Sequence, residues 1–377
     1  MAIAPSTRQL YCFSGRKGTR VLRFNRFLRT LLGTFSFCLG LSPSFAPALS
    51  AQPNPAAPAA RRSTQPKTTS APPKSAPDSL QARQIRSELE FLASDALRGR
   101  GSGTPDELVA ATYLASELRQ IGIAPAGDNG DYIQDVVSEV HHRDGSTTSW
   151  NTRNVIGLLA GRDPVLKNQV VLLSAHLDHL GVGKSPNGAP NSIYHGADDD
   201  ASGCVAVLQL ARALARGLRP RRTVLFAFFG SEETGGQGNQ YFLEHPPVPL
   251  SAIVANLEFE MIGRQDSAVR PDQLWLTGYD RSNLGPQLAR HGAFLVADPH
   301  PDQQFFKRSD NYALAKQGIV AHTVSSYGLH ADYHRTSDDL QHIDFPHMEQ
   351  AIRSMIVPVR WLTNSSFKPQ WVEGKKP

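Results

Sequence analysis

The 377-residue sequence contains only three cysteines, and this scarcity excludes a small domain held together by disulfides. Two of them, Cys12 and Cys38, lie within the first 51 residues, so a chain without that segment retains Cys204 alone. No intramolecular disulfide is then possible. The folded part must be stabilised by its hydrophobic core, which a domain of about 300 residues can supply.

Acidic residues are nearly absent from the front of the chain. Residues 1–79 contain eleven Lys and Arg but a single acid, Asp78, whereas the remaining residues contain 28 basic and 33 acidic side chains. The net charge of +5 and the pI near 9.1 therefore arise from the front of the chain. Because the rest is mildly acidic, we expect no nucleic-acid partner.

The front of the chain also lacks an apolar run long enough to span a membrane. The run at residues 31–41 is too short for this, and prolines follow it directly. A basic segment, residues 8–29, precedes it, and small residues follow up to Ala51, an order typical of a secretory signal peptide. We therefore predict a signal peptide over residues 1–51, export to the periplasm or the medium, and no stable membrane anchor after processing.

Residues 52–79 consist almost entirely of Pro, Ala, Ser, Thr, Gln and Lys, a composition that predicts a disordered linker. Helical periodicity begins at residue 80, and the catalytic domain is predicted to span residues 80–377. After residue 150, short apolar runs alternate with helical patterns. Strands are predicted at 154–159, 170–175, 223–229, 252–259, 273–277 and 319–324, and helices at 106–121, 202–216, 238–245, 283–291, 310–317 and 346–363. This alternation predicts an α/β three-layer sandwich with a mixed, largely parallel central sheet flanked by helices.

Histidines and carboxylates follow the predicted strands. His176 and Asp178 come after the strand at 170–175, and Glu232 and Glu233 come after the strand at 223–229. Three further groups occupy comparable places: Asp198, Asp199 and Asp200 before a helix, Glu258 and Glu260 at the end of a strand, and Tyr333 and His334 near the C-terminus. Because ligands of such folds bind at the carboxyl ends of the strands, we expect these side chains to converge.

Imidazole together with carboxylate is the ligand set that Zn²⁺ favours, whereas oxygen ligands alone favour Mg²⁺ or Ca²⁺. Two histidines and three carboxylates are too many for one tetrahedral ion, and they suit two ions about 3.5–4 Å apart. Asp178, two residues after His176, is placed to orient its imidazole. Alternatively, the acidic run at 198–200 caps the following helix, and the pair Glu232-Glu233 lies on a solvated surface.

The order of these motifs resembles that of the di-zinc aminopeptidases of metallopeptidase family twenty-eight. The motifs are His-x-Asp, Gly-Ala-x-Asp-Asp-Ala-Ser-Gly, Glu-Glu, Glu-Met-Ile-Gly and Asp-Tyr-His, and the resemblance covers roughly residues 85–363. It implies a zinc exopeptidase fold, two zinc ions per chain and peptide substrates with a free N-terminus. It also implies Glu232 as the general base, Asp178 as the carboxylate that supports His176, and five metal ligands: His176, Asp199, Glu233, Glu260 and His334.

Two positions depart from, or extend, the family pattern. The family more often has Asp where this chain has Glu260, and Glu258 competes with it for the role of ligand; the place of Glu260 next to Met261 favours Glu260. Tyr333 is either an oxyanion donor, as in some relatives, or a packed aromatic ring. Three other histidines near the motifs, His179, His195 and His330, are expected to be loop residues rather than ligands.

Three other functions remain open on the sequence alone. One is a different amide hydrolase, such as a carboxypeptidase or deacylase, which requires an anchor for a free carboxylate. The second is a glutaminyl cyclase-type transferase, which works with one zinc ion. The third is a non-catalytic ectodomain. The sequence does not indicate the side-chain preference or the oligomeric state.

Overall fold

The computed structural model describes residues 79–141, 146–184, 188–189 and 192–377, all of which belong to one compact unit, Ala71–Pro377. The predicted signal peptide, residues 1–51, and the predicted linker, residues 52–79, lie outside the described residues except for Ser79. The Ser79 side chain accepts a hydrogen bond from the Ala82 N–H and caps helix α1 (Leu80–Leu92).

Within the described residues a nine-stranded mixed sheet forms the centre of the unit, in the order β1-β3-β7-β4-β8-β11-β9-β10, with β2 also paired to β3. The strands are β1 (Ala124–Pro125), β2 (Ile133–His141), β3 (Thr147–Leu159), β4 (Val170–His176), β7 (Thr223–Phe229), β8 (Ile253–Phe259), β9 (Leu274–Leu276), β10 (Leu295–Ala297) and β11 (Ala321–Ser325). The central strands β7, β4, β8 and β11 run parallel to one another, whereas β7 is antiparallel to β3 and β11 is antiparallel to β9. A separate two-stranded ribbon pairs β5 (Gly181–Gly183) with β6 (Ser192–Tyr194).

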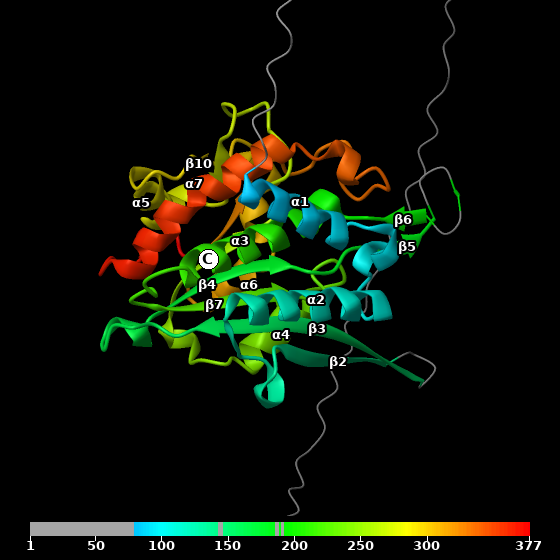
Figure 1. Cartoon of the computed structure of the whole chain (residues 1–377), viewed down its shortest axis with the longest axis horizontal. Coiled ribbons are helices and arrows are strands. Elements are labelled where there is room, and N and C mark those ends of the chain that lie inside the picture. The colour runs from blue at the N-terminus through cyan, green and yellow to red at the C-terminus, as the bar shows by residue number, and fades with distance from the viewer. Residues whose placement is uncertain (1–78, 142–145, 185–187, 190–191) are drawn as a thin grey trace, which may run out of the picture. The chain divides into compact units, whose positions relative to one another are not determined.

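Helices cover both faces of this sheet, which confirms the predicted α/β sandwich (Figure 1). Helix α1 packs on one face together with α2 (Pro105–Ile121), α3 (Gly203–Ala215), α5 (Leu284–Arg290) and α7 (Phe345–Asn364). Helices α4 (Gln237–Glu244) and α6 (Asn311–Lys316) pack on the other. Among the described residues, no helix combines the length and apolar character that crossing a bilayer requires.

The central strands read as continuous apolar runs because both of their faces are covered. All seven residues of β4 are buried. Val171 and Leu173 join the core cluster under α3, whereas Val170 and Leu172 join the cluster under α4 and α6, as the alternation of side chains along a strand requires. The sheet is therefore fixed in register from both sides, and its carboxyl edge is a rigid platform for the residues that follow the strands.

Candidate metal centre

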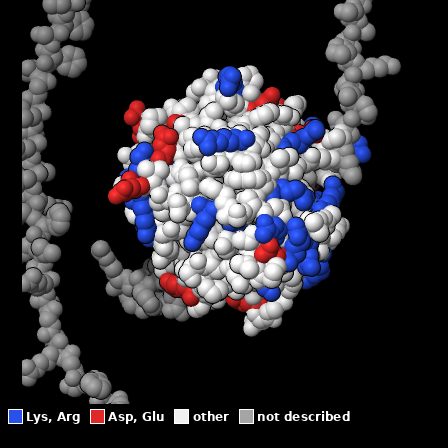
Figure 2. Space-filling view, turned by 90° about the vertical axis from the view of Figure 1, so that its left-hand side faces the viewer, with Lys and Arg blue, Asp and Glu red and all other residues white. Residues whose placement is uncertain are grey.

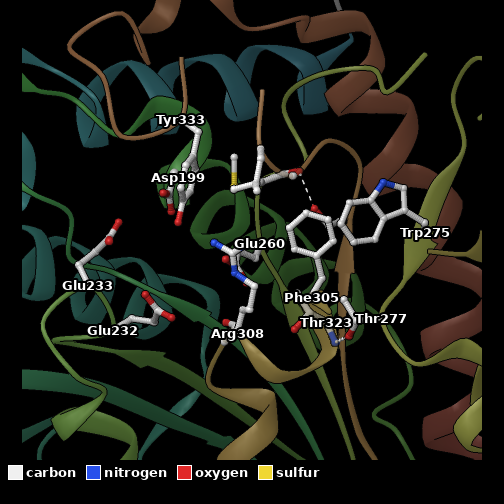
Figure 3. A pocket seen from close by; sticks show the side chains of 15 residues that line it. Asp199, Glu232, Glu233, Glu260, Trp275, Thr277, Phe305, Arg308, Thr323 and Tyr333 are labelled. Carbon is white, nitrogen blue, oxygen red and sulfur yellow. Dashed lines mark hydrogen bonds between the residues drawn. The ribbon is translucent and has the colours of Figure 1, made fainter. Parts of the chain in front are cut away.

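The residues that follow the central strands meet at the carboxyl edge of the sheet. His176 is the last residue of β4, Glu232 and Glu233 follow β7, and Glu260 directly follows β8. Because β4 pairs in parallel with both β7 and β8, the three chain segments leave the sheet side by side. Figure 3 shows Asp199, Glu232, Glu233 and Glu260 turned toward one cavity. The predicted convergence of the motifs is therefore present in the structure.

Asp199 lies at the centre of this cluster. Its Oδ1 is 3.1 Å from Nε2 of His176, and its Oδ2 is 3.2 Å from Nε2 of His334. Glu260 has a carboxylate oxygen within 4.8 Å of ligand atoms of both His176 and Asp199. On the other side, Oε2 of Glu233 lies 3.0 Å from Nε2 of His334. The two oxygens of Asp199 thus face two different sets of potential ligands.

His179 belongs to this cluster as well, although the sequence favoured a loop residue. Its side chain is buried, and its Nδ1 lies 2.7 Å from Oε1 of Glu233 and 3.9 Å from Oδ2 of Asp199. His330 and His195 lie elsewhere: Nε2 of His330 is 3.2 Å from Oδ2 of Asp198, and His195 pairs with the exposed Asp95. The only sequence signal for His179 is its position three residues after His176.

The three consecutive aspartates have different partners. The Asp198 carboxylate accepts a hydrogen bond from the Gly263 N–H at 2.7 Å. The Asp200 carboxylate accepts from three backbone N–H groups, those of His176, Gly203 and Met261, at 3.0–3.2 Å. The helix-capping interpretation therefore holds for Asp200, which binds the first N–H of α3. Asp199 is the member of the run whose carboxylate faces His176 and His334.

Gly203 makes this arrangement possible. A Cβ atom at this position would collide with the carbonyl oxygen of Phe259 and with the Asp200 carboxylate. The start of α3 therefore approaches the end of β8 at backbone distance, and Asp200 can bind both segments at once.

Asp178 connects three segments around the site. Its Oδ1 accepts a hydrogen bond from the Glu232 N–H at 3.0 Å, and its Oδ2 accepts from the Ser102 hydroxyl at 2.5 Å. Its carbonyl oxygen lies 3.2 Å from Nδ1 of His176. Asp178 thus fixes the backbone that carries Glu232, and the His176 ring is oriented mainly by the main chain of Asp178, since its Oδ1 is 3.8 Å from Nδ1.

Glu258 and Glu260 separate clearly in the structure. Oε2 of Glu258 accepts hydrogen bonds from the Asn311 N–H at 2.6 Å and from the Thr323 hydroxyl at 3.4 Å. Glu260 instead lines the cavity together with Asp199 and Tyr333. The structure therefore brings Glu260, and not Glu258, to the histidines.

The cavity has a volume of about 240 Å³ and runs from the acidic cluster to an aromatic wall. Trp275 and Phe305 form that wall as a stacked pair with ring centroids 5.2 Å apart. Tyr333 stacks on His334 at 3.8 Å, and Arg308 extends between the acids and Phe305 (Figure 3). None of these wall residues except Tyr333 was identified from the sequence.

The cluster fits a metal ion. Nε2 of His176, Nε2 of His334 and Oε1 of Glu233 are buried and make no directed hydrogen bond within the described part of the chain. Burial raises the pKa of Glu260 to about 7, and the charge of Asp199 adds to this against the opposing effect of His176. Buried carboxylates of this kind need a cation, and a mixed imidazole–carboxylate donor set suits zinc.

Fold and cluster together define an α/β protein with a candidate metal centre at the carboxyl edge of its sheet. The chain belongs to peptidase family M28, whose family model matches residues 154–357. The family suspected from the motifs is thereby confirmed. A curated relative, the leupeptin-inactivating enzyme 1 of Streptomyces exfoliatus, is 28% identical over 190 residues. The match covers 50% of this chain and 38% of that enzyme, so the chain matches well under half of its relative's length.

Solved structures of similar fold include the zinc aminopeptidase BSAP of Bacillus subtilis, with a TM-score of 0.58 and 15% identity over 78% of this chain and 98% of that one. The glutaminyl cyclase of Porphyromonas gingivalis has a TM-score of 0.55 and 20% identity, over 74% and 97% of the two chains. At such identities the likeness establishes the fold, which is the zinc exopeptidase type expected from the sequence. The reaction has to be inferred from the residues of the site.

Zinc is expected to stabilise this protein more at high pH than at low pH. Burial raises the folded-state pKa of Glu260 to about 7. Burial lowers the pKa of His334, but Asp199 and Glu233 outweigh it and raise that pKa to about 10. Both values lie above those of the unfolded chain, so the metal-free protein loses stability as the pH rises through about 4.5–7 for Glu260 and about 6.5–10 for His334.

Thermal unfolding with excess chelator and with zinc, at about pH 6 and about pH 8, measures this effect. The gain in Tm on adding zinc should be larger at the higher pH, where fewer protons compete with the ion for these side chains. An equal gain at both pH values would contradict the assignment of this cluster as the metal centre.

Proposed function

We propose that this protein is a zinc-dependent aminopeptidase with two zinc ions per chain. Membership of peptidase family M28 supports a metallopeptidase. The observation that carries the finer proposal is Asp199, whose two oxygens face His176 on one side and His334 on the other, in a cavity that Glu232 also lines. An arrangement of this kind suits a carboxylate shared by two ions.

The proposed ligands divide into two sets that share Asp199. His176 and Glu260 complete the first, and Glu233 and His334 complete the second. His179, through its contact with Glu233, orients that carboxylate in the second set. Zinc bound here supplies Lewis acidity, which makes water a nucleophile near neutral pH and polarises the scissile carbonyl group.

Glu232 is the proposed general base. Burial, reinforced by the neighbouring acids Glu260 and Asp310, raises the pKa of Glu232 well above its ordinary value and so strengthens it as a base. In the reaction its carboxylate takes a proton from the attacking water as the C–O bond forms. It then gives that proton to the amine nitrogen as the C–N bond breaks. The hydrogen bond that the Glu232 N–H donates to Asp178 fixes the main chain from which this side chain extends.

Tyr333 is proposed to donate a hydrogen bond to the oxyanion that develops on the carbonyl oxygen. Burial and the nearby carboxylates of Asp199 and Glu233 raise its pKa, so the phenol keeps its proton. Its stacking on His334 fixes the ring at the cavity edge. The acidic side of the cavity suits the α-ammonium group of a peptide N-terminus.

Arg308 supports a second candidate function, an amide hydrolase that binds a substrate carboxylate. It lines the cavity, and within the described residues its guanidinium makes no ion pair within 4.0 Å. Such a cation is the anchor that a carboxypeptidase or a deacylase of N-acyl amino acids requires. The substrate tests below separate the two candidates.

Export to the periplasm or the medium remains part of the proposal. It rests on the basic and apolar order of residues 1–51, which lie outside the described residues. N-terminal sequencing of the mature protein from the exported fraction tests it.

A panel of aminoacyl-nitroanilides, with and without N-acetylation, tests the reaction. We expect hydrolysis of substrates with a free α-amine, no hydrolysis of the acetylated analogues, and loss of activity with chelator that zinc restores. Metal analysis of the active protein should give about two zinc ions per chain. Cleavage of N-acyl amino acids, or of peptides from the C-terminus, would favour the carboxylate-binding hydrolase instead. Activity that chelation leaves unchanged would exclude both.

Replacing the proposed base tests the mechanism. Glu232→Gln should retain the zinc content and lower kcat by about 10²–10⁴-fold, since the amide cannot accept the proton of water. Glu244→Gln, which changes an exposed glutamate on α4, is the matched control and should have normal kinetics. Near-normal turnover of Glu232→Gln would contradict the assignment of the base.

The same substitution at two neighbouring glutamates tests the ligand assignment. Glu260→Gln should lose about one zinc equivalent per chain after gel filtration, because the amide is a poor ligand. Glu258→Gln should retain both, since that side chain binds the Asn311 N–H rather than the histidines. Metal analysis of both variants decides, and the opposite pattern would assign the ligand to Glu258.

A further inference from the structure

The end of the domain opposite the metal centre has an unusual surface. Residues 160–169 lead directly into β4 and residues 216–222 lead directly into β7, and both strands end at the metal centre. Seven-residue strands place this end about 20 Å from the cluster. Residues 364–368 pack beside them, since Arg222 donates a hydrogen bond to the Phe367 carbonyl oxygen at 2.6 Å. We call these three segments the basic end.

Charge of one sign dominates the basic end. The three segments contain seven Lys and Arg and a single acid, although the chain from residue 80 onward carries a net negative charge. The acid, Asp163, is paired with Arg221 at 2.7 Å. Five of the cations are exposed: Arg162, Lys167, Arg216, Arg219 and Lys368. Figure 2 looks onto this side of the molecule and shows Lys and Arg in clear excess over Asp and Glu.

Two aliphatic side chains stand exposed among these cations. Val165 is 71% and Leu218 is 70% exposed, the highest values among the large hydrophobic residues of the described part of the chain. Their loops lie side by side, because Arg162 donates to the carbonyl oxygens of Pro220 at 3.0 Å and of Arg219 at 2.8 Å. Each aliphatic side chain is therefore an apolar tip flanked by cations.

We propose that the basic end docks the protein on the surface of a membrane that contains anionic phospholipids. Clustered Lys and Arg are attracted to the negative surface potential of such a membrane. The exposed side chains of Val165 and Leu218 favour a lipid surface over another polyanion. They leave water when they enter the headgroup region, whereas a nucleic-acid backbone offers them no apolar contact. The docked orientation points the metal centre away from the membrane, so the cavity stays open to soluble substrate.

An environment-sensitive dye at position 218 of the full chain tests this proposal. Leu218→Cys is labelled in a protein carrying Cys12→Ser and Cys38→Ser, and the buried Cys204 is retained. The emission should shift to the blue with phosphatidylglycerol-containing vesicles and not with pure phosphatidylcholine vesicles. The basic residues of 1–79 are common to every variant, so binding through them alone leaves the dye in water.

Charge reversal provides the matched comparison. Arg216→Glu with Arg219→Glu should remove the blue shift and weaken vesicle binding at least about tenfold at physiological salt, as the charge of this end predicts. Lys184→Glu with Arg270→Glu, two reversals outside the basic end, should change neither quantity. Peptidase activity on a soluble substrate, unchanged in both double variants, reports that they fold.

Three results would overturn the proposal. The first is an unshifted emission from position 218 on anionic vesicles. The second is an equal shift from a dye placed at Arg270→Cys, which would indicate unspecific adsorption. The third is binding of double-stranded DNA through Arg216 and Arg219 without any vesicle-dependent shift, which would assign the basic end to a nucleic acid.

Discussion

The structure depends on one constraint: several carboxylates of like charge are held close together in one cavity. Asp199, Glu232, Glu233 and Glu260 line one cavity, in which Asp199 is buried and the three glutamates are partly buried. Burial is the largest cause that raises the pKa of Glu232 and of Glu260. Repulsion between the neighbouring carboxylates raises both pKa values further. Histidines relieve part of the repulsion, and a dication relieves more. Because the carboxylates repel one another, the folded protein needs a rigid scaffold that prevents them from moving apart.

That scaffold is built from backbone groups bound by neighbouring carboxylates. Asp200 ties the ends of β4 and β8 to the start of α3, and Asp338 accepts hydrogen bonds from the N–H groups of Asp198 and Asp199. Arg100 is fully buried and donates to the carbonyl oxygens of Leu177 and Gly196, which joins the loop after β4 to the acidic loop. The main chain of His176 and that of Asp199 are thus held by carboxylates other than the proposed ligands.

The sequence allowed prediction of the centre of the fold better than of its edges. The strand at 223–229 matches β7 residue for residue, and helix 202–216 differs from α3 by one residue at each end. Such elements are buried on both sides, so their apolar pattern is complete. Strand β2 was not predicted. Among the residues that the structure describes it pairs only with β3, and Val137 on it is 61% exposed, so its apolar pattern is incomplete.

The candidate site follows the same logic. Residues next to buried strands were predicted to converge and they do, because parallel neighbours share an edge. His179 was missed because a second histidine in one loop has no spacing that distinguishes a ligand from a surface residue. Trp275, Phe305 and Arg308 were missed because they reach the cavity from segments whose order along the chain does not indicate their contact. The roles of the site residues stay predictions.

The charge distribution of the folded unit explains how the two ends of the sheet can differ in function. Carboxylates gather where the parallel strands end, and arginines and lysines gather where they begin. The net charge of the whole chain does not reveal this separation, because the cations of residues 1–79 outnumber the excess acids of the remaining residues. A molecule polarised in this way is oriented by any charged surface before contact, since the summed field acts over about a Debye length. The same field favours the approach of a cationic group to the cavity. The two activities proposed for the opposite ends of the sheet would therefore depend on one electrostatic property of the domain.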